Sequence, residues 1–362
     1  MRPVKIPTDP EIQKIAKILV EHSARVKKGD YVQIVAGMPA RDLILEVYKQ
    51  IIQKGAYPVL KTYFEGLSYI YYKYASEEQL KNFPKIAYFE MKNTDAVIYI
   101  GAPENRYELA TISPDPLTIR DKVTRKIVDV RLKKKWIIFD YPVADFAKEA
   151  DMSLPEYRKF VFEACMQDWE KLSVFMNKVK KVIDNGKKVR IKTPDTDLTF
   201  GIKGRLGAIG NGTHNMPDGE VWTAPVEDTE GYINFTYPYE RMGRMIKGIK
   251  LEFKKGKVVK ASSKTNFDIL DAMLKTDKGA RILGELGIGC NFNIQKFTNN
   301  LLFDEKIGGT IHLALGHAYT ECNGKNRSAI HADIVKDLRP KFGGGEVWID
   351  DKLLIKDGKF KI

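Results

Sequence analysis

The sequence YVQIVAGMPARDLILEVYKQIIQKG, residues 31–55, sets the fold class of the first half of the chain. Tyr31–Gly37 is a β-rich apolar run, and residues 40–55 carry apolar side chains at helical spacing before a terminal glycine. Further apolar, strand-sized runs follow at residues 58–64, 96–103 and 135–142. Continuous apolar strands of this kind suit a parallel sheet that helices cover. We therefore predict an N-terminal α/β domain with a mostly parallel sheet.

The second half of the chain has a different pattern. Short alternating strand patterns and glycine turns are typical of antiparallel strands, and they cover residues 187–204, 232–238, 246–262 and 346–362. Helical patterns are expected at residues 155–185, 266–274 and 278–286. Because the composition changes near residues 185–188, we place the domain boundary there. We expect an α/β domain over residues 1–187 and an α+β domain with largely antiparallel strands over residues 188–362.

Composition excludes several classes of protein. The chain has 362 residues, of which 43% are hydrophobic and 30% charged, as in globular proteins. Its apolar runs are too short to span a membrane, and the first residues lack the apolar region of a secretory signal. Three cysteines without paired spacing form neither a disulfide framework nor a zinc-finger pattern. We expect a cytoplasmic protein that does not contact a membrane.

The net charge of +13 raises the question of an anionic partner such as nucleic acid. The lysines are spread along the chain among Glu and Asp, and no recognised nucleic-acid-binding motif is present. A lysine-rich surface is the simpler interpretation, so we expect no nucleic-acid partner. A basic nucleic-acid-binding protein is kept as the less favoured alternative; it would bind with a steep dependence on salt.

Histidine clustering is the first chemical signal. The chain has five histidines, and three of them, His312, His317 and His331, lie within twenty residues. In an extended segment, His331 and Asp333 point to the same face, so an imidazole and a carboxylate could reach one divalent ion. Residues 310–316 are also strand-like, and the small residues that share a face with His312 leave room for a ligand or ion.

Two acidic residues lie among glycine and apolar residues. Glu220 is part of NMPDGEVWTAP (residues 215–225), and Glu285 is part of GELGIGCN (residues 284–291). Alone, each is more simply interpreted as a turn or helix-end carboxylate, although an unpaired buried carboxylate is costly. Carboxylates together with imidazoles suit Zn²⁺, Co²⁺ or Mn²⁺. No H-E-x-x-H helix, phosphate loop, G-x-S-x-G elbow or G-x-G-x-x-G turn offers a competing site.

Taken in order, these motifs resemble the thermophilic metallo-aminopeptidases of the aminopeptidase T and aminopeptidase S type. The resemblance covers nearly the whole chain. Its most specific part is the ordered set DGEVWTAP, GELGIG, HLALGHAY and IHAD, with LLFDE before the third motif. Each motif alone is weak, whereas the ordered set is specific.

The resemblance implies a site with two divalent ions and a bridging water, held by Glu220, Glu285, His312, His331 and Asp333. Tyr319 matches a tyrosine beside the metals that ligates them or stabilises the transition state. Our hypothesis for the general base is a metal-bound carboxylate, Glu220 or Glu285. Glu305 is left out of the ligand set, because two additional residues separate it from His312 relative to the aminopeptidase T pattern. His317 is expected to lie nearby without a ligand role.

The family further implies a homodimer that releases N-terminal residues from short peptides. In that interpretation the second domain, residues 188–362, is the metal-binding catalytic domain. A protein of the same fold that binds peptides or small molecules without cleaving them is the main alternative. The presence of all five implied ligands favours the enzyme.

Overall fold

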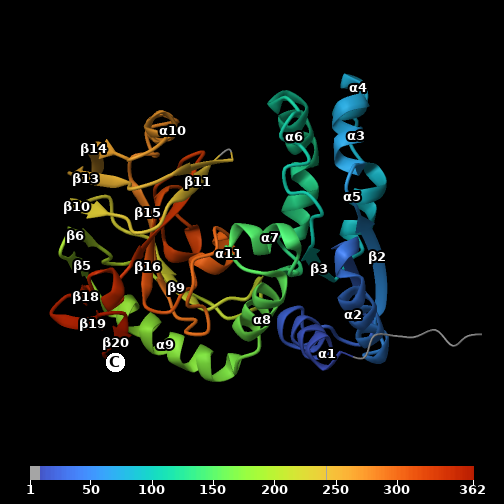
Figure 1. Cartoon of the computed structure of the whole chain (residues 1–362), viewed down its shortest axis with the longest axis horizontal. Helices are drawn as coiled ribbons and strands as arrows, with labels where there is room; N and C mark the ends of the chain where they lie inside the picture. Colours follow the sequence, from blue (N-terminus) through green and yellow to red (C-terminus); the bar gives the residue numbers. More distant parts are fainter. Residues whose placement is uncertain (1–8, 242) are drawn as a thin grey trace, which may run out of the picture. The chain divides into compact units, whose positions relative to one another are not determined.

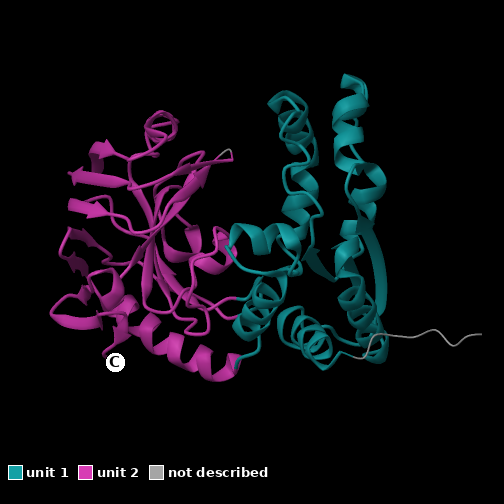
Figure 2. Ribbon diagram, in the orientation of Figure 1, with its two compact units in different colours: residues 1–167, 212–217 teal, residues 168–211, 218–362 magenta. Residues whose placement is uncertain are grey.

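The computed structural model describes residues 9–241 and 243–362, which form two compact units. Unit 1 comprises Met1–Gln167 and Gly212–Pro217, and unit 2 comprises Asp168–Asn211 and Asp218–Ile362 (Figure 2). This division differs from the expected boundary at residue 187, because the helix at Trp169–Asn185 packs against strands of unit 2. The short segment Gly212–Pro217 also belongs to unit 1, so a single boundary in the sequence cannot separate the two units.

Unit 1 is built on a five-stranded parallel sheet with the strand order β2-β1-β3-β4-β8. Figure 1 labels β2 and β3 of this sheet and the helices α1 to α8 of the unit. Its elements are α1 (Pro10–Lys17), η1 (Ile18–Ser23), β1 (Tyr31–Gly37), η2 (Met38–Ala40), α2 (Arg41–Gln53), β2 (Tyr57–Tyr63), α3 (Leu67–Tyr74), α4 (Glu77–Lys81), α5 (Lys85–Lys92), β3 (Ala96–Gly101), α6 (Pro114–Arg131), β4 (Lys135–Asp140), α7 (Ala144–Glu149), α8 (Leu154–Cys165) and β8 (Asn215–Met216).

The central strands of unit 1 explain its fold. β1 pairs in parallel with both β2 and β3. Val32, Ile34 and Ala36 on one of its faces are fully buried, and Gln33 on the other face is 3% exposed. Burial on both faces is what parallel strands require, because crossover helices cover the sheet. The α/β expectation for this half of the chain is therefore confirmed.

Helix boundaries in unit 1 follow capping side chains. The Ser76 hydroxyl accepts a hydrogen bond from the Gln79 backbone N–H, and the Gln79 side chain accepts one from the Ser76 N–H, so α4 begins as expected.

The single helix expected over residues 155–185 is instead two helices, α8 and α9. They separate because Asp168 caps a new helix by accepting a hydrogen bond from the Lys171 N–H at 3.0 Å.

Unit 2 consists mainly of antiparallel strands, as expected. Its elements are α9 (Trp169–Asn185), β5 (Lys188–Thr193), β6 (Thr196–Gly201), β7 (Gly207–Gly210), β9 (Glu220–Thr223), β10 (Glu230–Asn234), β11 (Tyr239–Arg241), β12 (Arg244–Ile246), β13 (Lys250–Lys254), β14 (Lys257–Ser262), α10 (Phe267–Leu274), β15 (Leu283–Gly289), α11 (Leu301–Asp304), β16 (Thr310–Gly316), η3 (Thr320–Cys322), β17 (His331–Asp337), η4 (Pro340–Phe342), β18 (Glu346–Ile349), β19 (Lys352–Lys356) and β20 (Lys359–Phe360).

Two larger sheets of unit 2 share one hydrophobic core. An eight-stranded sheet has the order β14-β13-β10-β6-β5-β18-β19-β20, and a five-stranded sheet has the order β17-β16-β15-β9-β7. Alternate residues of the second sheet, such as Leu286, Ile288 and Leu313, pack into this core together with side chains of α9. The intervening residues of these strands therefore point to the opposite face of the sheet.

One secondary-structure expectation in this region is wrong. Residues 278–286 were expected to be helical, but they form a turn followed by the start of β15. Gly284 lies so close to the carbonyl oxygens of Gly316 and His317 that an added Cβ would be 2.5 and 2.3 Å from them. This close approach between chain segments outweighs the local helical spacing.

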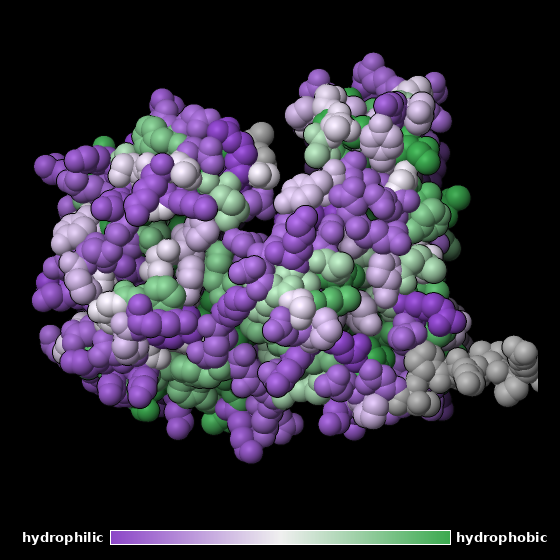
Figure 3. Space-filling view, in the orientation of Figure 1, coloured by the Kyte–Doolittle hydropathy of each residue, from purple (hydrophilic) through white to green (hydrophobic). Residues whose placement is uncertain are grey.

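The face of the chain drawn in Figure 3 is largely polar. Figure 3 shows that hydrophilic side chains cover much of the visible face, with apolar residues interspersed among them. Among residues 9–241 and 243–362, none of the helices combines the length and the apolar character needed to cross a membrane.

Candidate metal centre

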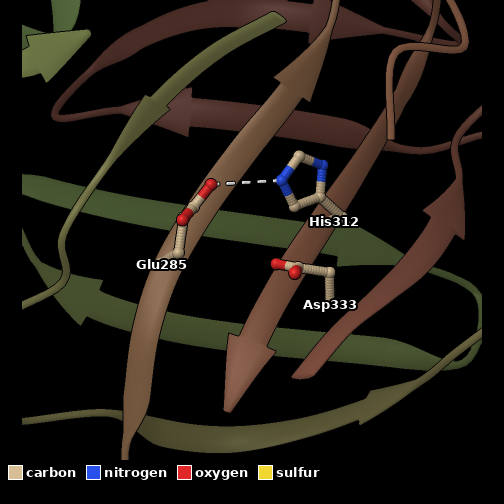
Figure 4. A group of neighbouring side chains, drawn as sticks. All are labelled: Glu285, His312 and Asp333. Atoms are coloured by element: carbon tan, nitrogen blue, oxygen red, sulfur yellow. Dashed lines mark hydrogen bonds and ion pairs between the residues drawn. The ribbon is translucent and has the colours of Figure 1, made fainter. Parts of the chain in front are cut away.

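Three neighbouring strands of unit 2 carry the candidate site. β15 and β16 are buried along their whole length, and β17 is buried except at its first residue. Each strand nevertheless contributes a titratable side chain to one group on the face opposite the core: Glu285, His312 and Asp333 (Figure 4). One nitrogen or oxygen from each of these side chains lies within 4.8 Å of the others. Such convergence of nitrogen and oxygen donors is what a divalent ion requires.

The strand register explains why these side chains meet. Glu285 and Asp333 both pair with Ala314, which lies between them on β16 and has only a methyl group. Gly287 pairs with His312, and a Cβ added there would lie 1.9 Å from His312 Cε1. The imidazole of His312 therefore needs a glycine on β15. The expectation of small residues beside His312 holds for Ala314, whereas Gly287 was not recognised as making room for the ring.

The remaining two candidate ligands come from the edges of this group. Glu220 opens β9 opposite Gly289, and its Oε2 lies 3.6 Å from His312 Nε2. His331 opens β17, and its Nε2 lies 3.4 Å from Glu285 Oε2 and 3.3 Å from Asp333 Oδ2. The structure thus brings together all five residues that the resemblance implies as ligands.

Hydrogen bonding fixes the direction of His331. Its Nδ1 donates to the backbone carbonyl of His317 at 2.8 Å, so its Nε2 faces the carboxylates. Metal-binding histidines are commonly oriented by such a bond from the second ring nitrogen. His317 contributes its backbone here, and its side chain is expected to have no ligand role.

The chemistry of this cluster fits a divalent ion. Four of its buried side-chain atoms have no hydrogen-bond partner within the described residues: Glu220 Oε2, Glu285 Oε2, His312 Nδ1 and Asp333 Oδ1. Each unsatisfied buried group costs about 1–3 kcal/mol, so several in one place point to a ligand that they bind. Carboxylate oxygens and imidazole nitrogens suit Zn²⁺, Co²⁺ and Mn²⁺.

Comparison with known proteins agrees with this chemistry. Residues 8–360 match the family described as thermophilic metalloprotease (M29). The chain belongs to this metalloprotease family. The match confirms the resemblance noted from the sequence and makes the chain a metallopeptidase, a hydrolase of peptide bonds that depends on divalent metal ions.

Relatives and solved structures extend the comparison. The metalloprotease is 25% identical to "Aminopeptidase 2" from Geobacillus stearothermophilus over 96% of this chain and 95% of that protein. Its fold is similar to that of wild-type AmpT from Thermus thermophilus, with a TM-score of 0.82, 22% identity, and coverage of 97% and 99%. It also resembles 2,5-dihydroxypyridine dioxygenase from Pseudomonas putida KT2440, with a TM-score of 0.62, 14% identity and 98% coverage of both chains. Because proteins with different names share this fold, the fold alone does not carry the function.

Electrostatics in the metalloprotease cluster favour bound cations. Burial raises the pKa of Glu220 to about 8, although the nearby positive charge of Lys306 acts in the opposite direction. Burial alone would lower the pKa of His312, but its hydrogen bond to Glu285 and the charge of Glu220 raise that pKa to about 10. Burial likewise opposes the charge of His331, yet Asp333 and Glu285 raise its pKa to about 11. Both imidazoles therefore hold protons until a cation competes for the carboxylates.

Sequence reasoning missed Lys306 and left out Glu305. Lys306 is only 1% exposed, and its Nζ lies 3.3 Å from Glu220 Oε1 and 2.5 Å from Glu305 Oε2. Burial raises the pKa of Glu305, which also interacts electrostatically with Asp333 and His312. Glu305 is therefore a neighbour of the cluster. The adjacent acid and base in the sequence DEK, residues 304–306, were the available signal.

Tyr319 lies at the accessible side of the cluster. Its ring centroid is 4.9 Å from that of His331, and the residue is 41% exposed. Desolvation and the negative charges of Glu285 and Asp333 raise the pKa of its hydroxyl. Tyr319 therefore keeps its proton at neutral pH and can donate a hydrogen bond.

Proposed function

We propose that this metalloprotease is an aminopeptidase that releases N-terminal amino acids from short peptides. The observation that carries the proposal is the buried group Glu220, Glu285, His312, His331 and Asp333, whose donor atoms converge on one face of the sheet. The name of the relative "Aminopeptidase 2" supports cleavage at the N-terminus. A peptide binder without activity is the alternative.

We further propose that these five residues hold two divalent ions, Zn²⁺, Co²⁺ or Mn²⁺. Three carboxylates among five ligands supply enough negative charge for more than one dication. When bound, such ions would lower the pKa of a coordinated water towards neutrality and polarise the scissile carbonyl. The free α-amine of the substrate would bind in one of two ways. Its lone pair would coordinate an ion, or its protonated form would pair with a nearby carboxylate.

The protein's own side chains supply the remaining steps. Glu220 is our candidate for the general base, because burial raises the pKa of its carboxyl to about 8, close to the working pH. Glu285 is the alternative base. Tyr319 donates its hydroxyl proton in a hydrogen bond to the oxyanion that develops on the substrate carbonyl.

A substrate assay tests the function. The full chain is incubated with leucyl-p-nitroanilide, first as prepared, then after chelation, and then with added Co²⁺ or Zn²⁺. We expect chelation to stop release of p-nitroaniline and added metal to restore it. A folded protein that binds metal but releases no product under any metal would support the binder instead.

The role of Glu220 is tested by Glu220→Gln, which keeps the shape of the side chain and removes its basicity. We expect turnover to fall by orders of magnitude, whereas Glu252→Gln, at an exposed position of β13, leaves turnover unchanged. A near-normal kcat for Glu220→Gln with both metals bound would contradict the assignment.

A homodimer and a cytoplasmic location complete the proposal. The homodimer follows from the family resemblance, and the cytoplasmic location follows from the cysteine pattern of the sequence. Light scattering at micromolar concentration tests the first, since a monomeric mass would contradict it.

A further inference from the structure

Lys306 is the most deeply buried charge beside the candidate metal centre that the proposed function does not use. It follows α11 and is 1% exposed. Its backbone N–H donates to the Phe303 carbonyl, and its own carbonyl accepts from the Asn291 N–H, each at 3.0 Å. The next residue approaches β15 so closely that a Cβ on Gly289 would lie 2.1 Å from the Ile307 carbonyl oxygen. The ammonium therefore extends from a fixed backbone.

The ammonium of Lys306 contacts two carboxylates at once. Its Nζ lies 3.3 Å from Glu220 Oε1 and 2.5 Å from Glu305 Oε2. Glu220 thereby has one oxygen on Lys306, and its other oxygen, Oε2, lies on the side of His312 without a hydrogen-bond partner among the described residues. A free Glu side chain could exchange its two oxygens by rotation, whereas a buried ion pair fixes one orientation.

The balance of charges around the site also bears on the role of Lys306. Glu220, Glu285, Glu305 and Asp333 place four carboxylates around two histidines, and within the described part of the chain Lys306 forms ion pairs with two of them, Glu220 and Glu305. Carboxylates buried this deeply are unfavourable unless a positive charge pairs with them. Once a cation has displaced the protons of the two histidines, one ammonium cannot balance four carboxylates, so it pairs with part of the set and leaves negative charge for dications.

We propose that Lys306 is a positioning residue of the metal centre, whose ammonium holds one oxygen of Glu220 and one of Glu305 so that Glu220 Oε2 faces the bound ion. This inference rests on the proposed metal site. It assigns no proton transfer to Lys306, and it distinguishes Lys306 from Glu220, which would itself be a ligand of the ion. A residue that acts only by its positive charge would repel a dication, whereas a positioning residue strengthens its binding.

The test is a cobalt titration of the metal-depleted full chain, read by the visible absorption of bound Co²⁺ and by chelator competition. We expect Lys306→Met to bind Co²⁺ about 10- to 100-fold more weakly than the wild type, as when groups that orient ligands are removed. We also expect an altered absorption spectrum. Lys306→Arg, which keeps the charge, should recover part of the affinity.

Lys336→Met is the matched control. Lys336 is also a buried lysine, 3% exposed, but its ammonium pairs with Asp195 at 2.6 Å and it lies on the core-facing side of β17. We expect this variant to lose stability and to keep the cobalt affinity and spectrum of the wild type. If Lys306→Met does not fold, Lys306→Gln is titrated in its place.

The outcomes separate this inference from the proposed function. Wild-type affinity and spectrum in folded Lys306→Met, or tighter binding, would overturn the positioning role while the metal site stands. A wild-type chain that binds no Co²⁺ would overturn the proposed metal site itself and this inference with it.

Discussion

The central strands of both units are mostly buried, but they carry different residues. β1 and β3 of unit 1 bury side chains such as Val32, Ile34 and Ile98, which favour folding because apolar surface leaves water. β15 and β16 of unit 2 are buried along their length as well, yet they include Glu285 and His312. A buried charge costs several kcal/mol before it is paired. The comparison teaches that the sheet of unit 1 serves stability, whereas one face of the sheet in unit 2 gives up stability for ligand binding.

The largest effect should come from removing a candidate ligand. Asp333→Ala removes the carboxylate that lies 3.3 Å from His331 Nε2, so we expect loss of bound metal and of detectable peptidase activity. Asp337→Ala is the control on the same strand, because it breaks a buried pair with Arg339 outside the ligand set. Metal analysis of both purified variants checks this. Full metal content in Asp333→Ala would remove the contrast between the two units.

A steric change should have a smaller effect. In Gly287→Ala, the new Cβ would lie 2.0 Å from His312 Nε2, so the ring must turn away from Glu285. We expect metal affinity to fall about 10- to 100-fold, as when a ligand loses its orientation. Gly186→Ala also creates a clash, 2.4 Å from Ile349 Cγ2, but in the core of unit 2. It should reduce stability and keep metal affinity, as measured by chelator competition.

A core substitution in unit 1 should leave the site unchanged. Ile34 is fully buried in β1, so Ile34→Ala should cost about 2–5 kcal/mol in the free energy of unfolding. We expect no change in Co²⁺ affinity, because this residue contributes packing alone. Denaturant unfolding and cobalt titration measure the two quantities separately. A large loss of metal affinity would show that the two sheets are not independent in function.

The smallest predicted signal is proton release on metal binding. His312 and His331 have pKa values of about 10 and 11 in the folded chain, above the value of about 6.5 expected when unfolded. Their protonated forms therefore stabilise the metal-free fold fully below about pH 6.5, and this contribution is lost as the pH rises through 10 to 11. At pH 7 a dication must displace these protons. Calorimetric titration in buffers of different ionisation enthalpy measures the release, and a buffer-independent heat would contradict the assignment.

Much of the fold could be predicted from local patterns. The strand at Tyr31–Gly37 has the expected bounds, because a continuous apolar run between a turn and a helix has few alternatives. Residues 278–286 were not predictable in this way. Their apolar spacing is helical, but Gly284 lies against the carbonyl oxygens of Gly316 and His317. Just beyond this range, Gly287 leaves room for the ring of His312. Local periodicity does not reveal such contacts between distant segments.

The candidate site, like the fold, was predictable from the sequence only in part. The H-x-D motif placed His331 and Asp333 on one face, because alternation along a strand is a local property. Lys306 was not found, since a lysine in a sequence is normally a solvated surface residue. Its burial depends on the contact of residues 306–308 with Asn291 and β15, far away along the chain.

The sequence by itself determined the class of each half of the chain, the family, and the residue types that can bind a divalent ion. Those properties depend on local periodicity and on side-chain chemistry. Only the tertiary structure decided that α9 belongs with unit 2, that Gly287 makes room for His312, and that the ammonium of Lys306 contacts Glu220 and Glu305. Strand register and burial bring together atoms from distant segments, and the low polarity of a buried site gives each of those contacts its energetic weight.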